Sequence, residues 1–183
     1  CSSPQAATNL DAKQLKLQVP QDATSLHLDS QNSQLSWMAN KINGTTHKGT
    51  VSIAKGALFM QKQEISGGEF IIDMTQITNL DDDGSSSQTL IQHLMSEDFF
   101  AVSNFPSAHL KITQITPNLK HLYQIQADLT IKDQTHPIEF DAKIEPKLGT
   151  ASAKFKIDRP RWGIQYGSGQ FFKELADNII KDE

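Results

Sequence analysis

Apolar and polar residues alternate with a period of two through most of the second half of the chain. The alternation occurs in four runs, at residues 108–113, 123–131, 138–145 and 151–158. A period of two places successive side chains on opposite faces of a strand. Short turns such as Pro117-Asn118 and Lys132-Asp133-Gln134 separate the runs. The pattern therefore predicts four antiparallel strands, each with one buried and one solvated face.

The first half shows the same pattern less regularly, in shorter apolar segments. These segments lie at residues 26–29, 35–39, 51–53, 58–60 and 70–74. Gly44, Gly56 and the Gly67-Gly68 pair stand between them and indicate turns. The total is about eight strands, the size at which a closed barrel either fills itself with side chains or holds a small ligand. We therefore expect an all-β fold, an antiparallel β-barrel.

Small residues recur on the predicted inward faces of these strands. They are the alanines at positions 39, 108, 127, 142, 151 and 153. Alanine leaves volume that larger side chains would fill, and an empty void is costly in a close-packed interior. We expect a hollow barrel whose interior holds an apolar ligand. The alternative is a packed core, in which small and large residues alternate because the interior of the barrel narrows along its length.

Phe99, Phe100 and Phe105, three of the nine phenylalanines, lie close together in a stretch that fits neither helical nor strand periodicity. Irregular backbone normally runs over the surface, where apolar rings are poorly placed. We therefore expect these rings to roof the interior of the barrel.

A short helix is predicted just before this stretch. Ser85 and Gln88 have the spacing of a capping box, with Ser85 as the N-cap. The apolar stripe that follows consists of Leu90, Ile91, Leu94 and Met95. We expect this helix to act as a lid. A second stripe, formed by Phe171, Leu175 and Ile179, favours another helix near the C-terminus.

Composition and charge narrow the classes of partner. The 183 residues suit one domain, and their net charge of -4 is spread without a basic cluster. Nucleic acid is therefore not an expected partner. No apolar run reaches the roughly 18 to 20 residues that a membrane-spanning helix needs. The oligomeric state is left open.

The N-terminal segment differs in composition from the rest. We divide the chain into an extension at residues 1–23 and a barrel domain at residues 24–183, because the first segment is polar and lacks strong periodicity. Cys1-Ser2-Ser3-Pro4 resembles the start of a mature bacterial lipoprotein, in which the N-terminal cysteine carries lipid. The resemblance implies lipidation of Cys1 and attachment to a membrane rather than spanning of it. An arbitrary chain boundary is the alternative.

Several segments in order resemble the YceI-like family, the lipocalin-like polyisoprenoid-binding proteins of bacteria. They extend from about Ser25 to Tyr166. The matching motifs are Trp37-Met38-Ala39-Asn40-Lys41, His47-Lys48-Gly49, the run 67–74, the run 93–100, Phe105-Pro106, the run 128–132 and the run 158–164.

The resemblance implies a lipocalin-like barrel that takes an isoprenoid or a similar long-chain lipid, in the periplasm or at the cell surface. The protein would then carry or store an isoprenoid quinone or a polyprenyl species. Family members usually continue beyond the position of residues 179–183 into a final strand that helps to close the sheet, whereas this sequence stops there.

Apolar and aromatic side chains are the predicted ligand contacts. They are Trp37, Met60, Phe70, Ile72, Met74, Leu94, Phe99, Phe100, Phe105, Leu110, Tyr123, Phe140, Phe155 and Trp162. His47, His93 and Arg159 are candidates for contact with a polar head group. Each has a structural alternative: tying down a turn for His47, bonding helix to loop for His93, and pairing with an acidic residue for Arg159.

Metal and catalytic signals are weak. Asp81-Asp82-Asp83-Gly84 hints at calcium but lacks the glutamate of an EF-hand loop, and the six histidines show no zinc spacing. No Gly-x-Ser-x-Gly elbow is present. We therefore expect neither a metal, nor a cofactor, nor catalytic residues. An enzyme acting on a lipid with His47 or His93 as base, and a packed barrel serving as an interaction module, remain alternatives.

Overall fold

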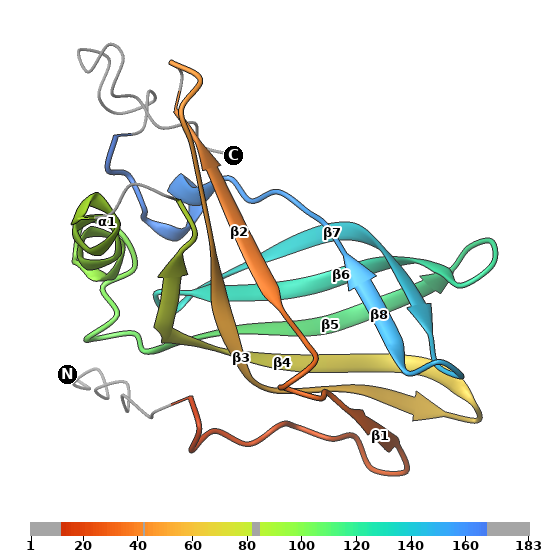
Figure 1. Cartoon of the computed structure of the whole chain (residues 1–183). Coiled ribbons are helices and arrows are strands. Elements are labelled where there is room, and N and C mark those ends of the chain that lie inside the picture. The colour runs from red at the N-terminus through yellow and green to blue at the C-terminus, as the bar shows by residue number, and fades with distance from the viewer. Residues whose placement is uncertain (1–11, 42, 82–84, 168–183) are drawn as a thin grey trace.

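The computed structural model describes residues 12–41, 43–81 and 85–167 (Figure 1). They form a curled antiparallel sheet with one α-helix and one 3-10 turn. The elements are β1 (Thr24–His27), β2 (Leu35–Asn40), β3 (Thr46–Gln61), β4 (Glu64–Asn79), α1 (Ser85–Met95), β5 (Ser107–Pro117), β6 (Leu122–Ile131), β7 (Gln134–Glu145), β8 (Thr150–Ala153) and η1 (Arg159–Trp162).

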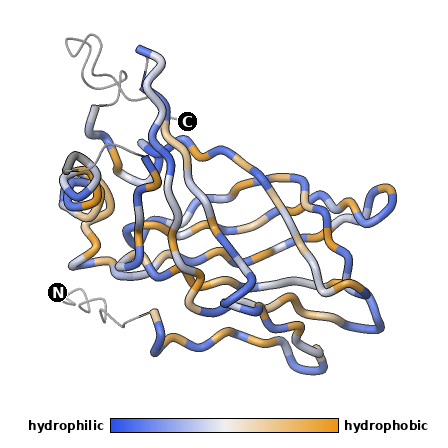
Figure 2. Tube along the Cα trace, in the orientation of Figure 1, coloured by the Kyte–Doolittle hydropathy of each residue, from blue (hydrophilic) through white to orange (hydrophobic). Residues whose placement is uncertain are grey.

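The eight strands pair in the order β1-β3-β4-β5-β6-β7-β8, and β2 also pairs with β3. Apolar and polar residues alternate along the central strands, as Figure 2 shows. The predicted all-β antiparallel fold with a short helix is confirmed. The sheet is a half-barrel, because among the described residues β8 pairs with β7 alone.

The β3–β4 hairpin corrects the prediction of turns at Gly56 and Gly67-Gly68, because all three glycines lie inside long strands. A side-chain carbon on Gly56 would lie 2.5 Å from the Phe70 ring. Glycine here permits close packing rather than a turn. The chain reverses at Lys62 and Gln63, which both have positive φ.

The last strand is shorter than predicted. It ends at Ala153 instead of running to residue 158. Ala151 and Ala153 pair with Ile144 and Ala142, so they share the inner face as predicted. Both alanines are nevertheless exposed, because β8 is an edge strand of the described sheet.

Helix α1 begins at Ser85, one residue earlier than predicted with Ser85 as the N-cap, and packs against β4. Leu94 is buried, while Leu90 and Met95 pack against the core. The side-chain contacts of the capping box and the predicted C-terminal helix lie outside the described residues. No described helix has the length and apolar character needed to cross a membrane.

Residues 12–20, here called the N-terminal strap, lie on the outer face of the sheet. Lys55 Nζ donates hydrogen bonds to the carbonyls of Lys13 and Leu15, both at 2.7 Å. The Glu69 carboxylate accepts from the backbone N–H of Gln18. The strap thus runs from the middle of β3 toward β1, which begins at Thr24. The domain division at residue 23 stays a prediction.

Candidate functional site

The two ends of the half-barrel differ in how completely side chains fill the interior. The turns β3–β4, β5–β6 and β7–β8 fall at one end, because alternate turns of an antiparallel series share an end. We call this the open end. The other end, which carries α1 and η1, is here called the closed end (Figure 1).

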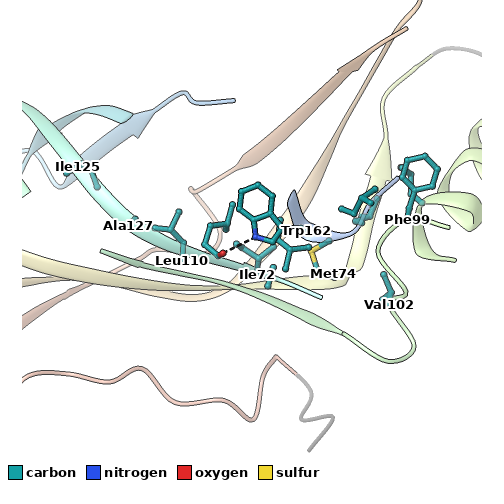
Figure 3. Packing of buried hydrophobic residues seen from close by; sticks show 14 of the residues in the cluster. Ile72, Met74, Phe99, Val102, Leu110, Ile125, Ala127 and Trp162 are labelled. Carbon is teal, nitrogen blue, oxygen red and sulfur yellow. Dashed lines mark hydrogen bonds between the residues drawn. The ribbon is translucent and has the colours of Figure 1, made fainter. Parts of the chain in front are cut away.

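Side chains fill the closed end. Trp162 is 0 % exposed, and its Nε1 donates to the carbonyl oxygen of Leu129 at 3.0 Å. Figure 3 shows the indole close to Ile72 and Met74, with Phe99 farther toward α1. These residues belong to one buried hydrophobic cluster. The interior is therefore solid at this end.

The turn η1 explains how Trp162 reaches the interior. Arg159 starts the turn, Pro160 follows as its second residue, and Gly163 ends it with φ of 70°. The backbone N–H of Gly163 donates to the Pro160 carbonyl at 2.9 Å. A side-chain carbon on Gly163 would lie 2.9 Å from Nε2 of Gln134. Glycine is favoured at this position by its positive φ, whereas the Gln134 amide is the end of a flexible side chain and could move aside.

Toward the open end, Ile125, Ala142 and Ile144 on the inner face are buried, but most of the other apolar side chains there are only half-buried. The half-buried residues are Leu58, Ile65, Phe70, Ile112, Ile115, Tyr123, Ile138 and Phe140. The Phe140 ring stacks on Phe155 at a centroid distance of 4.7 Å. A packed interior would bury such side chains almost completely. The concave face here presents apolar surface to solvent, and we call it the open apolar surface.

The predicted ligand contacts divide between these two regions. Six lie in the buried cluster: Ile72, Met74, Leu94, Phe99, Leu110 and Trp162. Phe70, Tyr123 and Phe140 belong to the open apolar surface, and Phe155 lies beside it. Trp37 and Phe100 are half-buried against the cluster, whereas Met60 and Phe105 are half-buried outside it. Ligand contact stays a prediction for each of them.

Five residues of the open apolar surface are absent from the predicted ligand contacts. Leu58, Ile112 and Ile138 were expected on the apolar faces of strands, whereas Ile65 and Ile115 were not predicted at all.

A register shift between Ile112 and Gln114 places a bulge in β5. Because the bulge adds one residue, Ile115 lies on the same face as Ile112 although the two are three positions apart instead of two. A similar register shift occurs in β3 between Phe59 and Met60, and Met60 pairs with Ile65. The spacing of Ile112 and Ile115, three positions apart in an otherwise alternating strand, was the feature of the sequence that could have revealed the bulge.

His47 has the structural partner given above as its alternative role. Its Nδ1 lies 2.7 Å from Asp81 Oδ2, and Asp81 Oδ1 accepts from the Lys48 N–H at 3.2 Å. Burial tends to raise the pKa of Asp81, but the hydrogen bonds from His47 and Lys48 outweigh it and hold that pKa below its usual value. The pair ties the start of β3 to the segment after β4.

His93 and Arg159 take part in a cluster at the closed end. His93 Nε2 lies 3.3 Å from Asp98 Oδ2, and its ring meets those of Phe99 and Tyr166 edge-on at 5.0 and 4.4 Å. The Arg159 guanidinium lies 6.0 Å from the Phe99 ring centroid and donates to the Tyr166 carbonyl at 2.7 Å. The cluster joins α1, the phenylalanine stretch and the segment after η1.

The YceI-like domain family matches residues 26–183. The chain belongs to the YceI-like family. No curated protein matches the chain. The motifs at 93–100 and 158–164, which supported the predicted resemblance, both build the closed end of this YceI-like fold.

A solved structure shows the same fold. BcnA of Burkholderia cenocepacia is similar at 17 % identity and a TM-score of 0.65, over 85 % of this chain and 92 % of that one. The Campylobacter jejuni YCEI protein is similar at 16 % identity and a TM-score of 0.49, over 97 % and 90 %. YceI-like proteins are generally binding proteins rather than enzymes, and membership indicates a hydrophobic ligand.

Proposed function

We propose that this YceI-like protein binds an apolar, chain-like lipid on the open apolar surface and carries or stores it at the cell envelope. Isoprenoid quinones and polyprenyl species are the expected class. The observation that carries the proposal is the half-burial of inward-facing residues such as Phe70, Ile112 and Phe140. A chain-like lipid would cover surface that is otherwise in contact with water.

Burial of the tail supplies the driving force. Each Å² of apolar surface removed from water contributes about 25 cal/mol before the costs of association are subtracted. A long prenyl tail therefore needs few polar contacts. Because Trp162 blocks the closed end, the tail would enter from the open end and stop against the buried cluster.

Lipidation of Cys1 and a periplasmic or cell-surface location are part of the proposal. Support comes from the N-terminal sequence Cys1-Ser2-Ser3-Pro4. One covalently anchored end and a folded body would keep the carrier beside the membrane that supplies its cargo.

The test uses Ala153→Trp. Ala153 is exposed and shares the inner face with its partner Ala142, so an indole has room there and would cover part of the open apolar surface. We expect the variant to fold normally and to lose most of its co-purifying lipid, measured by mass spectrometry of organic extracts. Ser152→Trp is the control, since Ser152 pairs with Lys143 on the outer face.

Two results would overturn the proposal. One is the repeated absence of any prenyl lipid from extracts of the unaltered protein. The other is an equal amount of bound lipid in Ala153→Trp and Ser152→Trp.

A further inference from the structure

We propose that the turns of the open end form a rim that docks on the surface of an anionic lipid bilayer. The rim consists of Lys62–Gln63, residues 118–122 and residues 146–149. The inference rests on the proposed function in one respect: the rim surrounds the entrance through which a lipid would pass.

Exposed leucines stand at the tips of two rim turns. Leu119 is 75 % exposed and Leu148 is 69 % exposed. Both turns are ordered by backbone hydrogen bonds, from Leu122 N–H to the Leu119 carbonyl at 3.0 Å and from Leu148 N–H to the Glu145 carbonyl at 3.0 Å. The leucines are therefore held outward on fixed turns instead of folding back onto the sheet.

The two turns are joined to each other through β7. The N–H of Ile144 donates to the carbonyl of His121 at 2.8 Å, and Leu122 pairs with Lys143. The apolar tips therefore belong to one continuous edge of the molecule. A single exposed leucine is ordinary on a protein surface, whereas here two of them stand on neighbouring turns of one edge.

Lysines flank the apolar tips. Lys120 and Lys147 are exposed next to the two leucines, and Lys62 is exposed on the third turn. The acidic groups beside the rim are Glu145, with which Lys143 pairs at 2.5 Å, and the exposed Glu64 at the start of β4. A chain with a net charge of -4 thus presents a basic edge here.

Leucine beside lysine is the combination that binds lipid interfaces, where the apolar side chain enters the acyl boundary and the cation meets anionic head groups. Each lysine near an anionic bilayer strengthens binding about fivefold. The tips are convex turns rather than a groove, which suits insertion into a soft surface better than docking of a folded partner. The position of the rim at the end of the sheet next to the open apolar surface also favours lipid.

The experiment is co-sedimentation of the full chain with vesicles. The protein carries Cys1→Ser, so that no acyl chain at residue 1 contributes. Vesicles of phosphatidylcholine with phosphatidylglycerol are compared with vesicles of phosphatidylcholine alone. We expect clear binding to the anionic vesicles and at least about tenfold weaker binding to the neutral ones, because three rim lysines lose their counter-charges.

Rim variants locate the contact. Leu119→Ser with Leu148→Ser, and separately Lys120→Glu with Lys147→Glu, should each weaken binding about tenfold or more. Met38→Ser with Leu80→Ser is the matched control, since these side chains are 59 % and 52 % exposed on β2 and just after β4, outside the rim. Circular dichroism verifies the fold of each variant.

Several outcomes would overturn the inference. They are no binding to anionic vesicles, equal binding to neutral vesicles, and equal loss in the rim and control variants. Association of the chain with a second copy in sedimentation velocity, removed by the rim variants, would assign the rim to a dimer instead. Vesicle binding by protein stripped of lipid separates this inference from the proposed function, because docking needs no cargo.

Discussion

Replacement of Trp162 by phenylalanine tests whether the closed end is held by one buried hydrogen bond. The change keeps an aromatic ring but removes the Nε1 donor that meets the Leu129 carbonyl at 3.0 Å. A buried carbonyl without its partner costs about 1 to 3 kcal/mol. We expect the free energy of unfolding to fall by about 2 kcal/mol. With an m-value of roughly 2 kcal/mol/M, the urea midpoint should fall by about 1 M.

Trp37→Phe is the matched comparison. Trp37 also donates to a carbonyl, that of Thr78 at 3.2 Å, but Trp37 is half-buried and Thr78 is exposed. Water can replace that donor, so the loss should stay below about 1 kcal/mol. Far-UV circular dichroism follows both unfolding curves. Equal midpoint shifts for the two variants, or no shift for Trp162→Phe, would refute the reasoning.

Two further predictions concern stability at the closed half of the sheet. Burial lowers the pKa of His109, although attraction from Glu69 and Asp133 opposes the shift. The fold favours the neutral imidazole of His109. Its contribution to the free energy of unfolding should therefore be fully present above the ordinary pKa of about 6.5, and it should decline as the pH falls from there through the lower pKa of the folded state. His109→Gln should flatten that decline in urea unfolding curves; an unchanged slope would contradict it. Asp133 has φ of 56° in the β6–β7 turn, so Asp133→Gly should raise the unfolding temperature by about 2 to 4 °C, with a decrease counting against the reasoning.

Strand identity was predictable because the signal is local. A period of two is visible within a few residues, and it located β5, β6 and β7 together with the turn at Lys132 and Asp133. The role of Gly56 was not predictable in this way. It depends on the ring of Phe70, which reaches Gly56 only after β3 and β4 have paired.

The site was predictable in character but not in extent. The inward face is apolar, as expected, and Phe70, Tyr123 and Phe140 present apolar surface there. Which end would be filled depends on Trp162, whose hydrogen bond to Leu129 joins residues far apart in sequence. The expected roof is consequently part of the solid end, where Phe99 is buried.

The N-terminal strap has a bearing on how the molecule would stand in the envelope. Lys55 fixes it at the middle of the sheet, and from there it runs toward the edge that carries β1. These hydrogen bonds lie on the outer face of the sheet, opposite the open apolar surface. With Cys1 acylated, the anchor would therefore join the fold on the face that carries no cargo, and a lipid could enter or leave at the open end without disturbing the attachment.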